Sequence, residues 1–208
     1  MVLPSDIPDC LDAVICLPWW KQNTSYMSRR TIAIATALSV LVLGSPMITA
    51  RTNPLFVQYF DQGLERYEAG DYQGAIADYT KAIKIDPMSS RAYHNRGAAK
   101  QELNLHKSAI NDFNKAIELE KNNEILYHYY NNRAWSKYNV GDLKMGLIDA
   151  DKSIELNQDY MHSFDTRGRI RQDLGDVKGA CSDFKKSVSL GNQITVQYLN
   201  TEKGLWCR

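Results

Sequence analysis

The chain has 208 residues, of which 24% are charged and 44% hydrophobic. These proportions are those of a globular protein, and they exclude a long disordered or collagen-like chain. The formal net charge is only +1 at pH 7, so the sequence predicts no binding of nucleic acid through a strong basic field.

A basic pair followed by an apolar run is the first feature along the chain. Two arginines precede a mostly apolar run at 31–43, and a Gly-Ser-Pro segment ends this run before Ala50. This order is typical of a secretory signal peptide. The run is short for a membrane span, which needs about 20 apolar residues, but an uncleaved anchor and a buried core helix stay open as alternatives.

We therefore predict that residues 27–50 form a signal peptide or membrane anchor. The protein would be exported across, or anchored in, a cytoplasmic-type membrane and would act on its periplasmic, lumenal or secreted face. Residues 1–26 do not fit a signal peptide because they carry three aspartates. We predict that translation begins at Met27, that residues 1–26 are a disordered upstream extension, and that 51–55 form a linker.

A pattern of about 34 residues then repeats four times. Small residues lie at equivalent places in each copy, as is needed where two helices cross closely. In the first half of each copy these residues are Gly63, Gly97, Ala134 and Gly168, and in the second half they are Ala75, Ala109, Gly146 and Ala180. Gly-Asp pairs at 70–71, 141–142 and 175–176 separate the two halves, and such pairs end one helix and cap the next.

Each copy is therefore predicted to be a pair of helices, and neighbouring pairs must stack to bury their apolar faces. The predicted units cover 56–89, 90–123, 127–160 and 161–192 approximately. Residues 193–208 are predicted to form a capping helix and tail, with Ile194, Tyr198 and Leu199 as the apolar stripe of that helix.

This pattern of aromatic, Gly, Ala and Pro positions resembles the tetratricopeptide repeat. The resemblance implies an all-α fold, a right-handed α-solenoid of four helix-turn-helix repeats with a concave groove. The third unit departs most from the pattern: Ala134 replaces Gly, Gly146 replaces Ala, Ala150 replaces an aromatic residue, and about three residues are inserted near 124–126.

Two charged columns also recur in the units. Arginines precede the small residue of the first helix at Arg96, Arg133 and Arg167, and aspartates occupy the second helix at Asp78, Asp112, Asp149 and Asp183. Residues that recur in every unit favour a structural role, so we predict ion pairs within or between units, with a solvated charged face as the alternative.

The resemblance also implies that the first helices line the groove and contact a peptide. The residues that it places there are Arg91, His94, Asn95, His128, Asn131, Asn132, Trp135, Tyr138, His162, Asp165 and Arg169. Trp135 is interpreted either as an interface hot spot or as a side chain that fills space beside Gly146 and Ala150. Phe60, Leu64 and Thr166 replace residues of the family's carboxylate clamp, so a receptor for chaperone tails is not predicted.

Cysteines and histidines suggest no catalytic or metal chemistry. Cys181 and Cys207 are the cysteines that follow the apolar run, and they are interpreted either as a disulfide that holds the tail or as free thiols, with Cys181 a small buried apolar residue. The four histidines lack metal-ligand spacing, and no enzyme motif is present. We predict no metal, no cofactor and no enzyme activity.

The predicted function is a protein-protein interaction scaffold that binds a peptide or protein segment in its groove. It would help to assemble or maintain a complex at a membrane, and we expect a monomer that touches the membrane only through an uncleaved N-terminal segment. The alternative is an architectural protein that self-associates through Val57, Phe60 and Leu64 of the first unit.

Overall fold

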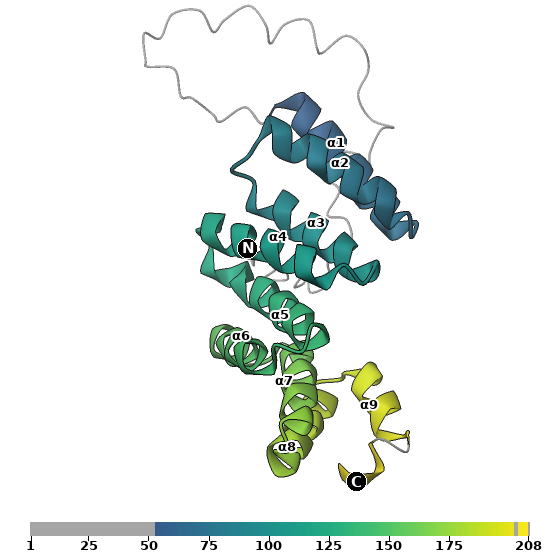
Figure 1. Ribbon diagram of the computed structural model, residues 1–208, viewed down its shortest axis with the longest axis vertical. Coiled ribbons are helices and arrows are strands. Elements are labelled where there is room, and N and C mark those ends of the chain that lie inside the picture. Colours follow the sequence, from purple (N-terminus) through teal and green to yellow (C-terminus); the bar gives the residue numbers. More distant parts are fainter. Residues whose placement is uncertain (1–52, 202–203, 208) are drawn as a thin grey trace, which may run out of the picture. The chain divides into compact units, whose positions relative to one another are not determined.

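The computed structural model describes residues 53–201 and 204–207, and every regular element in these ranges is a helix (Figure 1). The predicted extension at 1–26 and the signal or anchor segment at 27–50 lie outside the described residues. The helices are α1 (Pro54–Glu68), α2 (Tyr72–Ile85), α3 (Ser90–Glu102), α4 (His106–Leu119), α5 (Asn123–Asn139), α6 (Leu143–Leu156), α7 (Met161–Asp173), α8 (Val177–Ser189), α9 (Gln193–Leu199) and the short 3-10 helix η2 (Leu205–Cys207). Within these ranges, no helix combines the length and apolar character needed to cross a membrane.

The helices form antiparallel pairs that follow one another in chain order. Helices α1 and α2, α3 and α4, α5 and α6, and α7 and α8 pack most extensively as pairs, and each pair also packs against the next (Figure 1). The prediction of an all-α helical repeat solenoid is therefore confirmed.

Glycine on the first helix is required by an aromatic ring of the second. A Cβ atom at Gly63 would lie 2.6 Å from the ring of Tyr79, and one at Gly97 would lie 2.8 Å from the ring of Phe113. These separations are shorter than any van der Waals contact, so only glycine admits the ring. The rings of Tyr79, Phe113 and Phe184 are fully buried and form the centres of the first, second and fourth units.

The third unit solves the same packing problem with different side chains. Ala150 stands in the aromatic position, and Ala134 replaces the glycine opposite. The space is filled from the next unit by Ile170 of α7, which is fully buried and packs with both alanines. The equivalent residue in the second unit is Ala99. At this junction the large side chain, Ile170, thus belongs to the first helix of the later unit, and the small one, Ala150, belongs to the second helix of the earlier unit.

The glycines of the three Gly-Asp turns have the predicted left-handed geometry, and Asp71 and Asp176 cap the next helix, whereas Asp142 makes no side-chain cap hydrogen bond. Gly70, Gly141 and Gly175 have φ angles of 79°, 83° and 86°, which place them in the left-handed region. Asn104 has a φ of 58° in the second unit, and Leu105 follows it as an N-cap without a side-chain hydrogen bond.

The extra residues of the third unit lengthen its first helix. Helix α5 begins at Asn123 and has 17 residues, whereas α3 has 13. The insertion therefore adds about one turn at the N-terminus of α5.

The predicted charged columns form ion pairs within each unit. Arg96 pairs with Asp112, Arg133 with Asp149, and Arg167 with Asp183, at N to O distances of 2.7, 2.7 and 2.6 Å. The first unit has Gln62 in the arginine column, and Lys81 pairs with Asp78 there instead. One helical turn after this column, a further cation reaches the aspartate of each unit, which the sequence pattern did not predict. These cations are Arg66, Lys100, Lys137 and Arg171. The aspartates are buried, so their charges need both partners.

Helix α9 occupies the place of the first helix of a further unit. Between the third and fourth units, the hydroxyl of Ser153 donates to the carbonyl of Tyr127 and contacts the hydroxyl of Ser163. At the next junction, Ser187 donates to the carbonyl of Met161 and contacts Thr195 of α9 in the same way. The predicted capping helix is thus present, and it ends at Leu199, the last residue of its apolar stripe.

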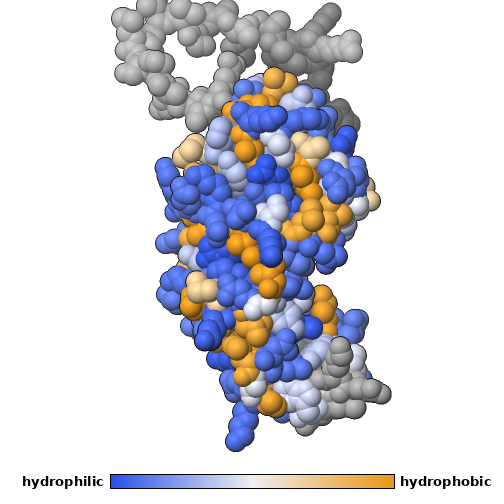
Figure 2. All heavy atoms as spheres, in the orientation of Figure 1, coloured by the Kyte–Doolittle hydropathy of each residue, from blue (hydrophilic) through white to orange (hydrophobic). Residues whose placement is uncertain are grey.

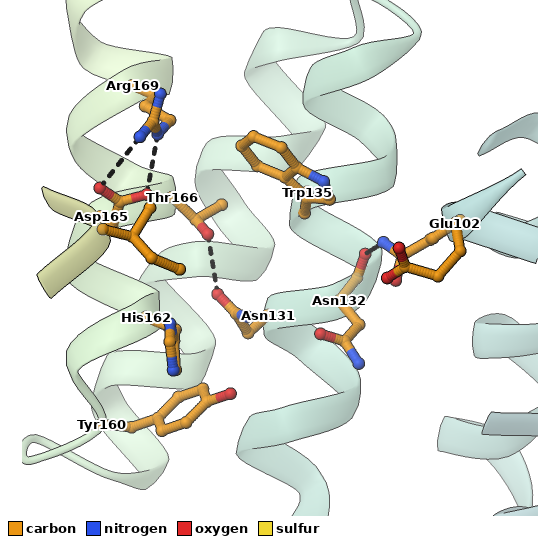
Figure 3. A pocket seen from close by; sticks show the side chains of 11 residues that line it. Glu102, Asn131, Asn132, Trp135, Tyr160, His162, Asp165, Thr166 and Arg169 are labelled. Carbon is orange, nitrogen blue, oxygen red and sulfur yellow. Dashed lines mark hydrogen bonds and ion pairs between the residues drawn. The ribbon is translucent and has the colours of Figure 1, made fainter. Parts of the chain in front are cut away.

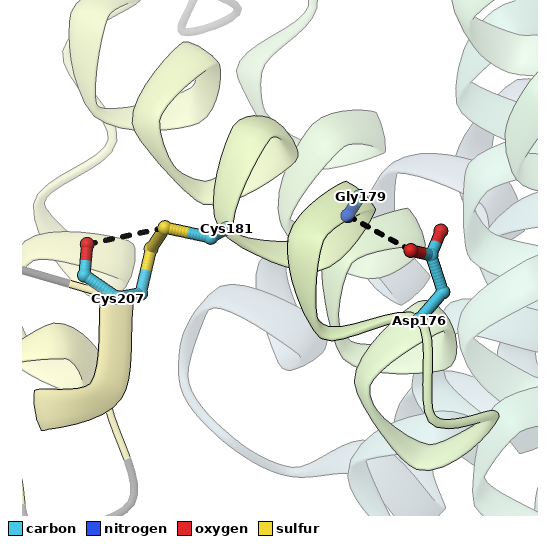
Figure 4. Close-up of a disulfide and its surroundings, with 4 residues drawn as sticks. All are labelled: Asp176, Gly179, Cys181 and Cys207. Atoms are coloured by element: carbon cyan, nitrogen blue, oxygen red, sulfur yellow. Dashed lines mark hydrogen bonds between the residues drawn. A yellow bond between two sulfur atoms is a disulfide. The ribbon is translucent and has the colours of Figure 1, made fainter.

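A disulfide joins the tail to the last unit. In the structure Cys181 of α8 is bonded to Cys207 of η2, with their Cα atoms 5.2 Å apart (Figure 4). Cys207 is buried against Ala180 and Phe184. The same figure shows the start of α8, where the Gly179 N–H donates to the Asp176 carboxylate at 2.9 Å.

Candidate functional site

A pocket of about 380 Å³ lies among the first helices of the last three units (Figure 3). Helices α3, α5 and α7 provide most of its walls, and the turn before α7 and the start of α9 complete them. The lining residues are Gln101, Glu102, Asn131, Asn132, Trp135, Tyr160, His162, Asp165, Thr166, Arg169 and Ile194.

Six of the predicted groove residues line this pocket, and five lie elsewhere. Those in the pocket are Asn131, Asn132, Trp135, His162, Asp165 and Arg169. Arg91 is exposed on the first turn of α3, and Tyr138 stacks near Trp135 with 5.4 Å between ring centroids. His94, Asn95 and His128 are partly buried between units. These three residues therefore contribute chiefly to packing.

Asp165 and Arg169 form a fixed ion pair in the wall of the pocket. Arg169 Nε donates to Asp165 at 2.8 Å, and the hydroxyl of Thr195 in α9 donates to the same carboxylate at 2.7 Å. The guanidinium of Arg169 also lies over the ring of Tyr198, 4.5 Å from its centroid, and 5.8 Å from the centroid of Trp135. Figure 3 shows the Asp165 and Arg169 pair facing Trp135 across the pocket.

Amide side chains connect neighbouring units at the base of the pocket. Gln101 Nε2 donates to the backbone carbonyl of Asn132 at 2.7 Å and to the hydroxyl of Ser136 at 2.8 Å. Thr166 donates its hydroxyl to Asn131 at 3.0 Å. The amide of Asn131 is thereby occupied, whereas the side-chain oxygen of Asn132 has no hydrogen bond among the described residues and is open to a ligand.

His94 is held between two asparagines and two aromatic rings. Its Nδ1 lies 3.2 Å from Asn95 Oδ1 and its Nε2 lies 2.9 Å from the side-chain nitrogen of Asn132. This arrangement assigns the proton to Nδ1 of a neutral ring. The ring stacks on Tyr129 at 4.3 Å. Burial lowers the pKa of His94 to about 4, so the ring is neutral at pH 7.

Two further histidines cluster with tyrosines at one end of the pocket. The rings of His128 and His162 lie 4.6 and 5.2 Å from the ring of Tyr160. Burial lowers the pKa of both histidines, and each is therefore uncharged near neutral pH. No group of three or more potential metal ligands occurs in the part of the chain that the structure describes.

Trp135 lines the pocket and does not fill the space left by the third unit. Ile170 fills that space and is fully buried. The indole of Trp135 is half-buried, and its N–H has no hydrogen-bond partner within the described ranges. Trp135 is therefore not the side chain that fills this space, and its role as an interface hot spot stays a prediction.

Five lining residues were not among the predicted groove residues, and one of them is Thr166 of α7. Gln101 and Glu102 end the first helix of the second unit, Tyr160 precedes α7, and Ile194 belongs to the cap. Gln101 and Glu102 occupy the same repeat positions as Tyr67 and Glu68 of the first unit, and an alignment of these positions could have identified them as lining residues. Ile194 lines the pocket because of the way in which α9 packs on the last unit, and the repeat pattern does not predict this packing.

The surface outside the pocket is mostly hydrophilic. Figure 2 shows apolar residues on one face as patches broken up by hydrophilic ones. Met88 and Ile148, which are 67% and 57% exposed, are among the most exposed large apolar side chains of the described residues outside the pocket. Val57 and Leu64 of the first unit are exposed at 38% and 36%, while Phe60 is partly buried against Tyr79.

Comparison with family models finds two matches. A model described as TPR repeat matches residues 63–104, and one described as Tetratricopeptide repeat matches residues 90–123. Comparison of the sequence with curated proteins finds no significant match.

Several solved structures have a similar fold. MamA from Desulfovibrio magneticus RS-1 is 17% identical, with a TM-score of 0.60 over 73% of this chain and 80% of that chain. YrrB, described as a TPR protein with an unusual peptide-binding site, is 20% identical, with a TM-score of 0.56 over 73% and 81%. The second TPR domain of human RPAP3, in complex with the HSP70 peptide SGPTIEEVD, is 20% identical, with a TM-score of 0.53 over 56% and 95%. At these identities the likeness concerns the fold.

Proposed function

Because this chain is a tetratricopeptide-repeat protein, we propose that it is a protein-interaction scaffold whose pocket on α3, α5 and α7 binds a peptide segment of a partner protein. The observation that carries the proposal is Trp135. Its indole is half-buried in a concave site beside the open amide oxygen of Asn132. A large aromatic residue next to groups that bond a peptide backbone is typical of an interface hot spot.

Similar folds support this proposal. Solved relatives include a TPR protein with a peptide-binding site and a TPR domain in complex with a nine-residue peptide. The walls of the present pocket are also connected across units by hydrogen bonds from Gln101 and Thr166, so the site is formed before a ligand arrives.

A random peptide library displayed on phage tests the proposal with the full chain as bait. We expect enriched peptides whose affinity falls about tenfold or more for Trp135→Ala, since such a residue contributes at least about 1.4 kcal/mol. Ile148→Ala is the matched control because Ile148 is exposed on the second helix of the same unit and does not line the pocket. Equal enrichment on wild-type protein and Trp135→Ala would contradict the proposal.

We also propose that the scaffold acts on the exported side of a membrane, where it helps to assemble or maintain a complex. The apolar run at 31–43 and the pairing of Cys181 with Cys207 support this location, since disulfides persist in oxidising compartments. Intact mass of the protein recovered from its native compartment tests it. A chain that keeps residues 27–50 and both thiols would argue for an anchor or for a protein that is not exported.

Self-association is the second candidate function. It is favoured by Val57 and Leu64, which are exposed on the first unit. Light scattering separates the two candidates, because a mass that rises with concentration and falls in Leu64→Lys supports an architectural protein, whereas a constant monomer mass supports the scaffold.

A further inference from the structure

The proposed peptide pocket has one free charge, and it is negative. Three of its residues carry a formal charge at pH 7: Glu102, Asp165 and Arg169. Asp165 and Arg169 neutralise each other, and their side chains are only 12% and 19% exposed. Glu102 is exposed, and within the described ranges its carboxylate accepts one long hydrogen bond, at 3.4 Å from the hydroxyl of Tyr67.

Acidic residues occupy the position of Glu102 in three of the four units and form a row, and the third unit has an asparagine there. The last residue of each first helix occupies this position, and all four are exposed. These residues are Glu68, Glu102, Asn139 and Asp173. A carboxylate at a helix C-terminus meets the negative end of the helix dipole, which is unfavourable for the helix. Helix stability therefore does not explain the row, whereas a cationic partner does.

Two carboxylates of the row, those of Glu102 and Asp173, lie near Trp135 or near its neighbour Tyr138. Glu102 lines the same pocket as Trp135, and the ring of Tyr138 lies tilted against the indole with 5.4 Å between the ring centroids. Burial raises the pKa of Tyr138, and the charge of Asp173 adds to this rise. Trp135 already has the guanidinium of Arg169 at 5.8 Å, so its indole accepts cations.

Among the described residues, no lysine or arginine forms an ion pair with this row. The lysines and arginines nearest in sequence, Arg66, Lys100 and Arg171, bond instead to the buried aspartates of the second helices. Arg91 lies eleven residues before Glu102 on the same helix, which places it about 16 Å away along the axis.

We propose that the pocket recognises a basic peptide segment, with a Lys or Arg side chain packed on Trp135 and paired with Glu102. Asp173 extends the same preference along the row. This inference rests on the proposed peptide-binding function. A partner with an acidic tail is disfavoured, because two nitrogens of Arg169 are already bonded to Asp165.

The test uses the peptides selected from the random phage library on the full chain. Lys and Arg should be enriched in the selected sequences relative to the input library. One selected peptide and its Lys/Arg→Ala version are then synthesised with a fluorophore, and their affinities are measured by anisotropy against wild-type protein, Glu102→Gln and Glu155→Gln. Glu155 is the control because its exposed carboxylate lies on the second helix of the third unit, outside the pocket.

We expect Glu102→Gln to weaken the basic peptide about fivefold, and the wild-type affinity to fall between 0.05 and 0.5 M salt, as for a charge at the rim of an interface. Glu155→Gln should leave the affinity unchanged. Selected peptides that are neutral or acidic, or that bind Glu102→Gln as tightly as wild type, would overturn the inference while leaving the peptide scaffold intact. If no peptide distinguishes wild type from Trp135→Ala, the scaffold proposal itself fails.

Discussion

Protonation of His94 should destabilise the folded protein, because its pKa is lower in the folded than in the unfolded chain. An unfolded histidine has a pKa of about 6.5, whereas burial lowers the pKa of folded His94 to about 4. Between these two values the unfolded chain binds more protons than the folded one, so protons favour unfolding. The stabilisation is therefore complete above about pH 6.5 and is lost as the pH falls toward 4.

We expect the melting temperature of His94→Gln to fall less between pH 7 and pH 5 than that of the wild type. The variant should be less stable at pH 7 because it loses the stacking on Tyr129, so the slope with pH is the diagnostic quantity. Thermal unfolding followed by circular dichroism at several pH values measures it. Parallel curves for the two proteins would show that another group controls the pH dependence.

At the scale of elements, the third and fourth units pack together through side chains whose sizes compensate each other. Ala134 and Ala150 are small where the other units have a glycine and an aromatic ring, and Ile170 is large where the second unit has Ala99. Each of these residues, taken alone, is an unfavourable departure from the residue at the same position of the other units. Together they fill the junction, because packing depends on the summed volume of facing side chains.

Ala150→Phe alone should destabilise the protein by about 2 kcal/mol through overpacking. The triple variant Ala134→Gly, Ala150→Phe, Ile170→Ala supplies the glycine, aromatic ring and alanine that pack between the first and second units at Gly63, Tyr79 and Ala99, and it should regain at least about 1 kcal/mol of this loss. Independent effects would instead make the triple variant less stable than the single one by about 3 kcal/mol or more. Urea denaturation of the three proteins decides between these outcomes.

Across the whole molecule, the disulfide closes a loop between residues 26 apart in the sequence. The chain-entropy model gives a stabilisation of about 3 kcal/mol for such a loop. Cys181→Ser should therefore lower the free energy of unfolding by about that amount without reductant. Reductant should lower the wild-type value and leave that of the variant unchanged. A wild type that does not respond to reductant would mean that the two thiols are not bonded in solution.

The repeat predicted most of the fold and half of the candidate site. Repeated positions such as those of Gly63 and Asp112 predict how the two helices of a unit pack, because the same residue type recurs wherever the same contact recurs. The sequence did not reveal that Ile170 fills the third unit or that Ile194 closes the pocket, since both contacts cross between units and break the repeat. The partly buried state of His94 was missed for a related reason, as Tyr129 of the next unit covers its ring.

One chain of contacts connects the tail to the pocket. The disulfide holds η2 on the last unit, α9 packs beside it, Thr195 of α9 bonds Asp165, and Asp165 orients Arg169. The wall that faces Trp135 is thus preorganised before any ligand binds. A ligand that meets such a wall loses less of its binding free energy to the ordering of protein side chains, which costs about 0.5 to 1.5 kcal/mol for each side chain that must be immobilised. The tail therefore contributes to affinity through conformational entropy, although none of its own atoms has to touch the ligand.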